Sequence, residues 1–355
     1  GPHASDWRAS AAAHANNGVG HRGARLQQRS AARGCRGAHT VISASAGASS
    51  GGDASSSSSS SSSRTPRVDS TGSSSATSGG GARLGVFSSG GVLVPHPDKA
   101  DKGGEDACFV LHDLGAFGVM DGVGGWAEEG VDPSAYSNCF AEKSAAAVLM
   151  GVRDPISILA EAHENTRLAG STTACVATLL ADGDKPGGGS QILVGNLGDA
   201  GAMVARGDVV LFSTPSQQHE FNLPFQMGWK EFYPESDTAD DAQAYAVNVA
   251  PGDVLIMGSD GLWDNVPPHE VAAVCAAGRA AGKDAQAVAE AIATVAFEHS
   301  VDPLYDSPFT QEARRNGYDV EWWEKAQGKT LVGGKSDDIA VVVAFLDREE
   351  NCPPP

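Results

Sequence analysis

Long apolar runs and basic charge are both scarce in this sequence. A bilayer-spanning helix needs about 18 or more consecutive apolar residues, and none occurs in the 355 residues, so we expect no transmembrane segment. Aromatic residues make up only 6%, whereas glycine occurs 44 times. The net charge of -19 excludes a general nucleic-acid binder, which needs a basic face. An acidic globular protein remains, and its charge is compatible with cation binding or simply with solubility.

Motifs for nucleophilic catalysis and for zinc are also absent. The six cysteines are Cys35, Cys108, Cys139, Cys175, Cys275 and Cys352. They include no CxxC pair and no metal-type spacing, which excludes a zinc motif and favours reduced core thiols over a disulfide framework. The sequence has neither a GxSxG motif nor a Walker-type GxxxxGK[ST] motif.

Composition divides the chain into three parts. Residues 1–83 carry nine Arg against three acidic residues and contain an unbroken serine run at 55–63. They hold too few large apolar residues to build a core, and an Arg- and Ser-rich, acid-poor start is typical of organellar transit peptides. We therefore predict a disordered, transit-peptide-like tail at 1–83, a folded domain at 84–348 and a C-terminal tail at 349–355.

Apolar periodicity predicts strands and helices within the folded region. The predicted strands are 107–112, 116–121, 171–180, 191–196, 201–206, 209–213, 254–258 and 339–346, and the predicted helices are 133–151, 155–168, 267–281 and 284–300. Residues 217–226 are interpreted as an ordered surface loop that forms a lid or recognition flap. Residues 302–331 show no regular pattern and are interpreted as irregular.

Carboxylates recur where these strands begin or end. A single Asp-Gly after a strand, such as Asp121-Gly122, is usually only a turn. Here, however, a predicted hairpin places Glu105 and Asp106 beside Asp121. Further carboxylates stand at other strand ends, namely Asp260, Asp337 and Asp338, and Asp199, in another glycine-rich turn, is a candidate fifth member. Like charges gathered at one sheet edge repel one another unless a cation lies among them.

The ligand chemistry of such a cluster favours hard ions. Oxygen ligands without His or Cys clusters select magnesium or manganese over zinc. One carboxylate bridging two ions would create a two-metal hydrolytic site for phosphoryl groups, which requires no nucleophilic Ser or Cys.

Six motifs in this order resemble those of the metal-dependent type 2C protein phosphatases. They are Gly-Gly-Glu105-Asp106-Ala, Val-Met-Asp121-Gly122-Val-Gly-Gly-Trp, Gly-Ser-Thr-Thr-Ala at 170–174, Asn-Leu-Gly-Asp199-Ala-Gly, Ser-Asp260-Gly-Leu-Trp-Asp-Asn and Gly-Lys-Ser-Asp337-Asp338-Ile. The resemblance implies an α+β fold, an α-β-β-α sandwich of two mainly antiparallel sheets flanked by helices. It also implies an Mn²⁺- or Mg²⁺-dependent protein serine/threonine phosphatase.

The resemblance further implies a role for each matching residue. Asp121 would bridge two ions and the Gly122 carbonyl would bind one of them. Asp260 and Asp337 would bind the other ion. Glu105 and Asp106 would hold metal-bound waters, one of which attacks the phosphoserine or phosphothreonine phosphorus. Asp199, with Asp260, would match a weaker third-metal site.

Two departures from the family pattern leave two roles open. Many members have His where this chain has Val123, so the usual general acid is missing. A metal-bound water, His96 or His219 could replace it, although either histidine could equally be a loop residue with a packing or hydrogen-bonding role. The phosphate-binding Arg upstream of Glu105 is also absent. Lys99 or Lys102 could replace it as a point charge, and a solvated surface lysine is the simpler reading for at least one.

A narrower resemblance concerns location and substrate. The motifs His96-Pro97, Gly130-Val131-Asp132-Pro133-Ser134 and residues 217–226 resemble the organelle-targeted branch of the family. Residues 307–335 resemble the plant and algal chloroplast phosphatases that act on photosystem II core phosphoproteins. These resemblances imply a thylakoid-associated enzyme of the chloroplast stroma, with a mitochondrial member of the same family as the alternative.

Two other functions fit the same residues. The missing His and Arg are compatible with a pseudophosphatase that only binds proteins. The carboxylates alone would also serve a hydrolase of small phosphate esters. For the phosphatase we expect phosphoprotein substrates, no nucleic-acid partner and a monomer.

Overall fold

The computed structural model describes residues 41–43, 83–181 and 189–351. The predictions for residues 1–40, 44–82 and 352–355 lie outside the described residues. Residues 41–43, within the segment predicted to be a disordered tail, form strand β1 (Val41–Ser43), which pairs in parallel with β3 (Asp106–Leu111).

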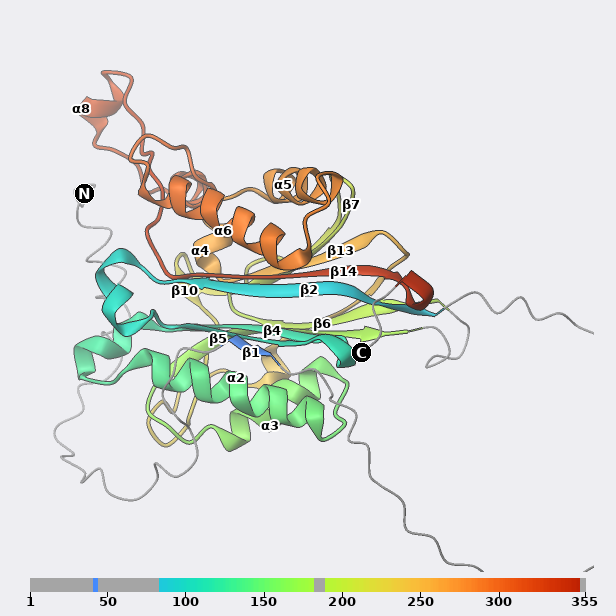
Figure 1. The fold of residues 1–355 in the computed structure, drawn as a ribbon. Helices are drawn as coiled ribbons and strands as arrows, with labels where there is room; N and C mark the ends of the chain where they lie inside the picture. Colours follow the sequence, from blue (N-terminus) through green and yellow to red (C-terminus); the bar gives the residue numbers. More distant parts are fainter. Residues whose placement is uncertain (1–40, 44–82, 182–188, 352–355) are drawn as a thin grey trace, which may run out of the picture.

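Two sheets packed face to face form the centre of the molecule (Figure 1). One sheet has the order β2 (Leu84–Val94), β14 (Ile339–Arg348), β13 (Asp253–Gly258), β7 (Gly201–Arg206) and β8 (Val209–Ser213). The other has the order β1, β3, β4 (Ala116–Gly122), β5 (Ser171–Leu180), β6 (Gln191–Leu197) and β12 (Gln243–Asn248), with β11 (Met227–Gly228) also paired to β5. Apart from β1 with β3, the strand pairs within these two sheets are antiparallel.

Helices cover the outer face of each sheet, as Figure 1 shows. The pair α2 (Pro133–Leu149) and α3 (Pro155–Asn165) lies against the β4 sheet, and the pair α5 (Pro268–Ala280) and α6 (Ala285–Val301) lies against the β14 sheet. The α-β-β-α sandwich expected from the sequence is therefore confirmed. The remaining elements are short: η1 (Pro97–Lys102), η2 (His112–Leu114), η3 (Gly124–Glu129), β9 (Gln218–Glu220), β10 (Leu223–Pro224), η4 (Ala239–Asp241), α4 (Asp260–Trp263), α7 (Pro308–Arg315), α8 (Trp322–Lys325) and η5 (Glu349–Asn351).

Strand β4 shows why its sequence is continuously apolar. Phe117 and Val119 point into the core between the two sheets, whereas Ala116 and Met120 point into the core beneath α2 and α3. Alternate residues of a strand face opposite sides, and both sides are buried here. The run can therefore contain only apolar side chains until it reaches Asp121 at the edge.

The sequence reading was wrong in some segments. Residues 302–331 are not wholly irregular, because they contain α7 and α8, and β12 was not predicted. Helix α7 begins at a local signal that was missed: Ser307 caps it by accepting a hydrogen bond from the Thr310 N–H. The flap at 217–226 is ordered, as expected, and contains the two-stranded β9–β10 sheet.

The expectation of reduced cysteines holds for only part of the described chain. Cys108, Cys175 and Cys275 are free and buried. Cys139, in contrast, is disulfide-bonded, so the expectation is wrong there. Sequence spacing alone does not reveal which cysteines meet in space.

Gly118 provides a test of the packing beneath β4. A Cβ at this position would lie 2.7 Å from Cδ1 and 2.8 Å from Cζ of the Phe109 ring, which is fully buried. We expect Gly118→Ala to lower the free energy of unfolding by roughly 1–3 kcal/mol, because the ring has no free space to move into. Urea denaturation measures the effect. Gly125→Ala is the matched control, since no atom lies within 4 Å of its added Cβ. Equal stability of the two variants would contradict this account.

Candidate metal centre

The β3–β4 hairpin brings the first two carboxylates together. Asp106 and Asp121 are direct partners in the antiparallel register, and Asp121 also lies opposite Thr173 of β5. Neighbouring residues in such a pair have Cα atoms only about 4.5–5.5 Å apart. The predicted meeting of Asp106 with Asp121 is therefore confirmed.

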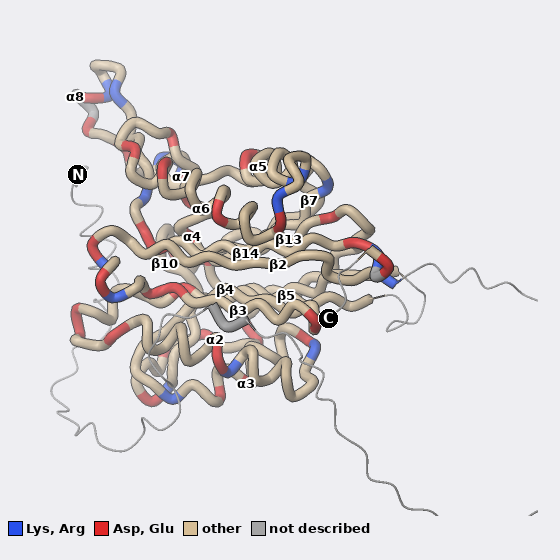
Figure 2. Tube along the Cα trace, in the orientation of Figure 1, with Lys and Arg blue, Asp and Glu red and all other residues tan. Residues whose placement is uncertain are grey.

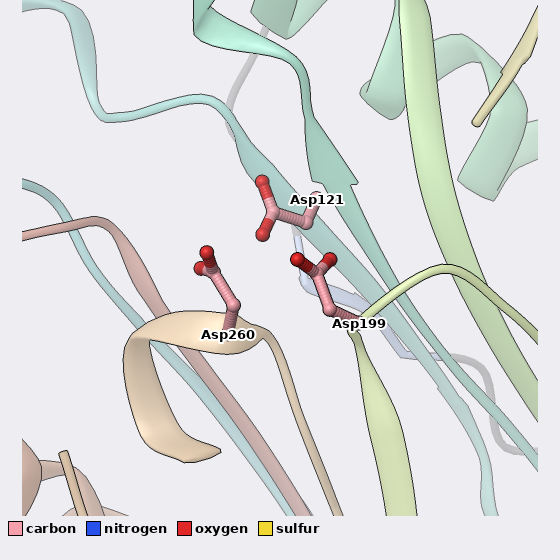
Figure 3. Close-up of side chains that lie close together, drawn as sticks. All are labelled: Asp121, Asp199 and Asp260. Carbon is pink, nitrogen blue, oxygen red and sulfur yellow. The ribbon is translucent and has the colours of Figure 1, made fainter. Parts of the chain in front are cut away.

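Three carboxylates from separate parts of the fold point toward one another (Figure 3). Asp121 lies at the end of β4, Asp199 lies in the turn between β6 and β7, and Asp260 is the first residue of α4. One ligand oxygen from each lies within 4.8 Å of the other two. Because β6 and β7 belong to different sheets, Asp199 stands where the chain crosses from one sheet to the other.

The charges in this cluster are not balanced. Burial, reinforced by the charge of Asp260, raises the pKa of Asp121 and the pKa of Asp199 well above their usual range. Burial and the charge of Asp338 do the same to the pKa of Asp106. Within the described part of the chain, Oδ1 of Asp106 and Oδ1 of Asp260 are buried without a hydrogen-bond partner. Asp260, one of the three carboxylates within 4.8 Å of one another, thus keeps an unpartnered oxygen, which fits a divalent cation.

Glycine residues permit the close approach that the cluster requires. A Cβ on Gly122 would lie 2.7 Å from the Glu105 carbonyl oxygen and 3.0 Å from that of Pro133. A Cβ on Gly261 would lie 3.0 Å from the carbonyl carbon of Asp338 and closer still to its oxygen. The backbone of α4 therefore rests directly against the residue that precedes β14, which fixes Asp260 relative to the Asp337–Asp338 pair.

Asp338 organises the loops around the site. Its Oδ1 accepts a hydrogen bond from the His96 N–H at 2.7 Å, and its Oδ2 accepts one from the Glu105 N–H at 3.0 Å. Lys99 Nζ donates to the same Oδ2 at 3.0 Å and to Glu105 Oε2 at 2.5 Å. Although burial opposes the charge of Lys99, these acidic partners raise its pKa above the usual value. Lys99 is therefore a fixed positive charge beside the predicted water-holding residues.

Ser259 fixes the orientation of Asp106, a contact that sequence reasoning missed. Its hydroxyl donates to Asp106 Oδ2 at 2.7 Å and accepts a hydrogen bond from the Ala340 N–H at 2.9 Å. This leaves Asp106 Oδ1 as the oxygen available to the site. The sequence signal for this contact was the small hydroxyl residue Ser259, which directly precedes Asp260.

The other predicted residues occupy varied positions. Asp337 lies beside the cluster: its Oδ2 is 3.7 Å from Lys335 Nζ, and the charge of Asp337 contributes to the raised pKa of Asp121. Lys102 is exposed, and among the described residues it forms no ion pair.

His96 Nδ1 accepts a hydrogen bond from the Asp98 N–H at 3.1 Å and caps η1. His219 lies in the flap, where it pairs with Asp237 at 3.0 Å and stacks on Phe225.

Lys335 is the most significant residue that the sequence reading left without a role. Its ammonium group donates to Asp260 Oδ2 and, at 2.7 Å, to Asp264 Oδ2. The charge and hydrogen bond of Lys335 outweigh the effect of burial and lower the pKa of Asp260. The available signal was a lysine within the acidic motif Gly-Lys-Ser-Asp337-Asp338.

Acidic positions occur in the segments around this site. Figure 2 shows acidic positions gathered at the left end of the sandwich, where the chain runs from β2 to β3 and from β4 to α2, with a few basic positions among them. No helix in the described ranges combines the length and the apolar character that membrane crossing would require.

Sequence comparison shows relatives over most of the chain. The model of the protein phosphatase 2C family matches residues 242–302. "Probable protein phosphatase 2C 26" of Arabidopsis thaliana is 40% identical over 261 residues, covering 73% of this chain and 83% of the relative. "Protein phosphatase PTC7 homolog" of Homo sapiens is 35% identical over 258 residues, covering 68% of this chain and 79% of the relative.

Structural comparison agrees with the sequence. The solved structure of the photosystem II phosphatase PBCP superposes with a TM-score of 0.65 at 38% identity, covering 74% of this chain and 98% of that chain. The shared motifs, the sandwich and this degree of identity lead to one conclusion: the chain belongs to the protein phosphatase 2C family and is a protein serine/threonine phosphatase.

Proposed function

We propose that this phosphatase hydrolyses phosphoserine and phosphothreonine with Mn²⁺ or Mg²⁺ held at the carboxylate cluster. Asp121, the Gly122 carbonyl, Asp260 and Asp337 would bind two ions, and Asp199 would complete a weaker third site. The observation that carries this proposal is the convergence of Asp121, Asp199 and Asp260 within 4.8 Å. The unpartnered oxygen of Asp260 supports it.

The cluster supplies the conditions that phosphomonoester hydrolysis needs. A divalent ion bound there lowers the pKa of a coordinated water and neutralises charge on phosphoryl oxygens. Asp106, oriented by Ser259, would accept a hydrogen bond from water through its free Oδ1. Glu105 would do the same with Oε1, because its Oε2 is bound to Lys99.

A substrate phosphate would reach Lys99 before it reaches the carboxylates of the cluster. The Lys99 side chain is 31% exposed, and its ammonium lies 3.8 Å from where a Cβ of Gly124 would stand, above the turn that follows β4. This position suits a point charge that attracts and orients a dianion. Lys102, which is exposed on the same helical turn, would add only long-range attraction.

Of the two candidate proton donors, the geometry favours His96. Its Nδ1 accepts a hydrogen bond, so the neutral ring carries its proton on Nε2. Its backbone is tied to Asp338 beside the site. His219, in contrast, is bound to Asp237 within the flap. We therefore propose that His96 donates the leaving-group proton that Val123 cannot supply.

For the substrate we propose photosystem II core phosphoproteins at the thylakoid surface, and hence a location in the chloroplast. The support is the 38% identity over 98% of the photosystem II phosphatase PBCP. The resemblance of residues 307–335 to the chloroplast branch adds to it. Three aromatic rings link this segment to the flap: Phe221 packs against Phe309 at 5.4 Å and against Tyr318 at 5.1 Å between ring centroids.

Asp121→Asn tests the proposed metal chemistry. We expect Mn²⁺-dependent hydrolysis of a phosphothreonine peptide to fall more than about a hundredfold, because the bridging charge is lost. The metal-free variant should also melt at a higher temperature, because one of three mutually repelling carboxylates has become neutral. Asp208→Asn, in the exposed turn between β7 and β8, is the matched control. Retained activity in Asp121→Asn would refute the proposed site, and an inactive wild-type protein would favour the pseudophosphatase.

Isolated thylakoids test the proposed substrate. With Mn²⁺ added, we expect the protein to remove phosphate from photosystem II core proteins at least about tenfold faster than from antenna proteins. Phosphate-specific immunoblotting over time measures both rates, and p-nitrophenyl phosphate serves as the small-ester control. Equal loss from both protein groups would contradict the core-protein assignment.

A further inference from the structure

Lys335 lies inside the acidic site rather than at its rim. Its side chain is 14% exposed, and its ammonium group is bound to Asp260 Oδ2 and Asp264 Oδ2, with Asp337 Oδ2 3.7 Å away. Asp199 contributes a further favourable charge. A lysine buried to this degree is uncommon unless it is paired, and this one has several acidic neighbours.

The position of Lys335 is fixed from several directions. Asn265, which is fully buried, accepts a hydrogen bond from the Lys335 N–H at 2.9 Å and donates one to its carbonyl at 2.8 Å. The ammonium group also lies 5.1 Å from the centroid of the Phe309 ring, which suits a cation–π contact.

The two oxygens of Asp260 face different partners as a result. Oδ2 is bound to Lys335, whereas Oδ1 is buried and has no hydrogen-bond partner in the described part of the chain. Asp264 also gives its Oδ2 to Lys335. A carboxylate whose oxygen already holds an ammonium group is a poor ligand for a second cation at the same place.

We propose that Lys335 is a positioning residue that acts as a built-in cation, preventing a divalent ion from binding between Asp260 and Asp264. It leaves Asp260 Oδ1 as the oxygen directed at the Asp121 side of the cluster. The inference rests on the proposed function, because it presupposes that divalent ions bind at Asp121. Its consequence is that Lys335 limits how many ions the site binds.

Calorimetric titration of the metal-free protein with Mn²⁺ tests this inference. In Lys335→Met, which keeps the contact with Phe309 but removes the charge, we expect one additional Mn²⁺ per chain, or binding of the weakest ion tightened about ten- to hundredfold. Lys335→Arg should bind Mn²⁺ as the wild type does. The double variant Lys335→Met with Asp264→Asn should lose the gain, because the new site needs Asp264. Lys329→Met, an exposed lysine on the same segment, is the control for charge alone.

The possible outcomes separate this inference from the proposed function. A wild-type protein that binds no Mn²⁺ contradicts the proposed function itself. A wild type that binds Mn²⁺ together with an unchanged Lys335→Met overturns only the role of Lys335. If Lys335→Met does not fold, Asp264→Asn alone decides. The inference expects that variant to bind as many ions as the wild type, and loss of an ion would show that Asp264 is a ligand rather than a partner of Lys335.

Discussion

Repulsion among buried carboxylates is the constraint on which this structure depends. Asp106, Asp121 and Asp199 each have a pKa raised by burial and by acidic neighbours. Protonation relieves this repulsion, and so does positive charge that reaches the cluster. The chain supplies some of that charge itself, through Lys99 on the side of Glu105 and Lys335 on the side of Asp264. The proposed divalent ions would neutralise the remaining carboxylate charge between these two lysines.

The sandwich makes this arrangement rigid. The carboxylates come from both sheets and from the turn that joins them, so neither sheet can shift without separating Asp121 from Asp260. Gly122 and Gly261 allow backbones to approach where a side chain would collide. Cores on both faces of β4 hold the strand in register up to its acidic end. The stability of the fold therefore maintains a site that is electrostatically unfavourable by itself.

The two lysines give the site two different sides. Lys99 is partly exposed and belongs to the loop that also carries His96, so this side suits contact with a substrate phosphate. Lys335 is enclosed by Asp260, Asp264 and Phe309, so it acts on the protein's own carboxylates. The family pattern that the motifs of this chain resemble has a histidine at the position of Val123, whose N–H is bound to the Ser171 carbonyl at 3.1 Å. Under the proposed mechanism, the loop that carries His96 would supply the proton that this histidine would otherwise donate.

Much of this could be predicted from the sequence, because it depends on local patterns. Apolar runs and glycine turns revealed most strands, and the hairpin placed Asp106 beside Asp121. Only tertiary structure joined Lys335 to Asp260, which lies 75 residues away, and Ser259 to Asp106, which lies 153 residues away. It also decided that β12 pairs with β6 and that Asp199 joins the cluster. Periodicity reports which face of an element is buried, whereas the partner of a buried charge depends on how distant elements pack.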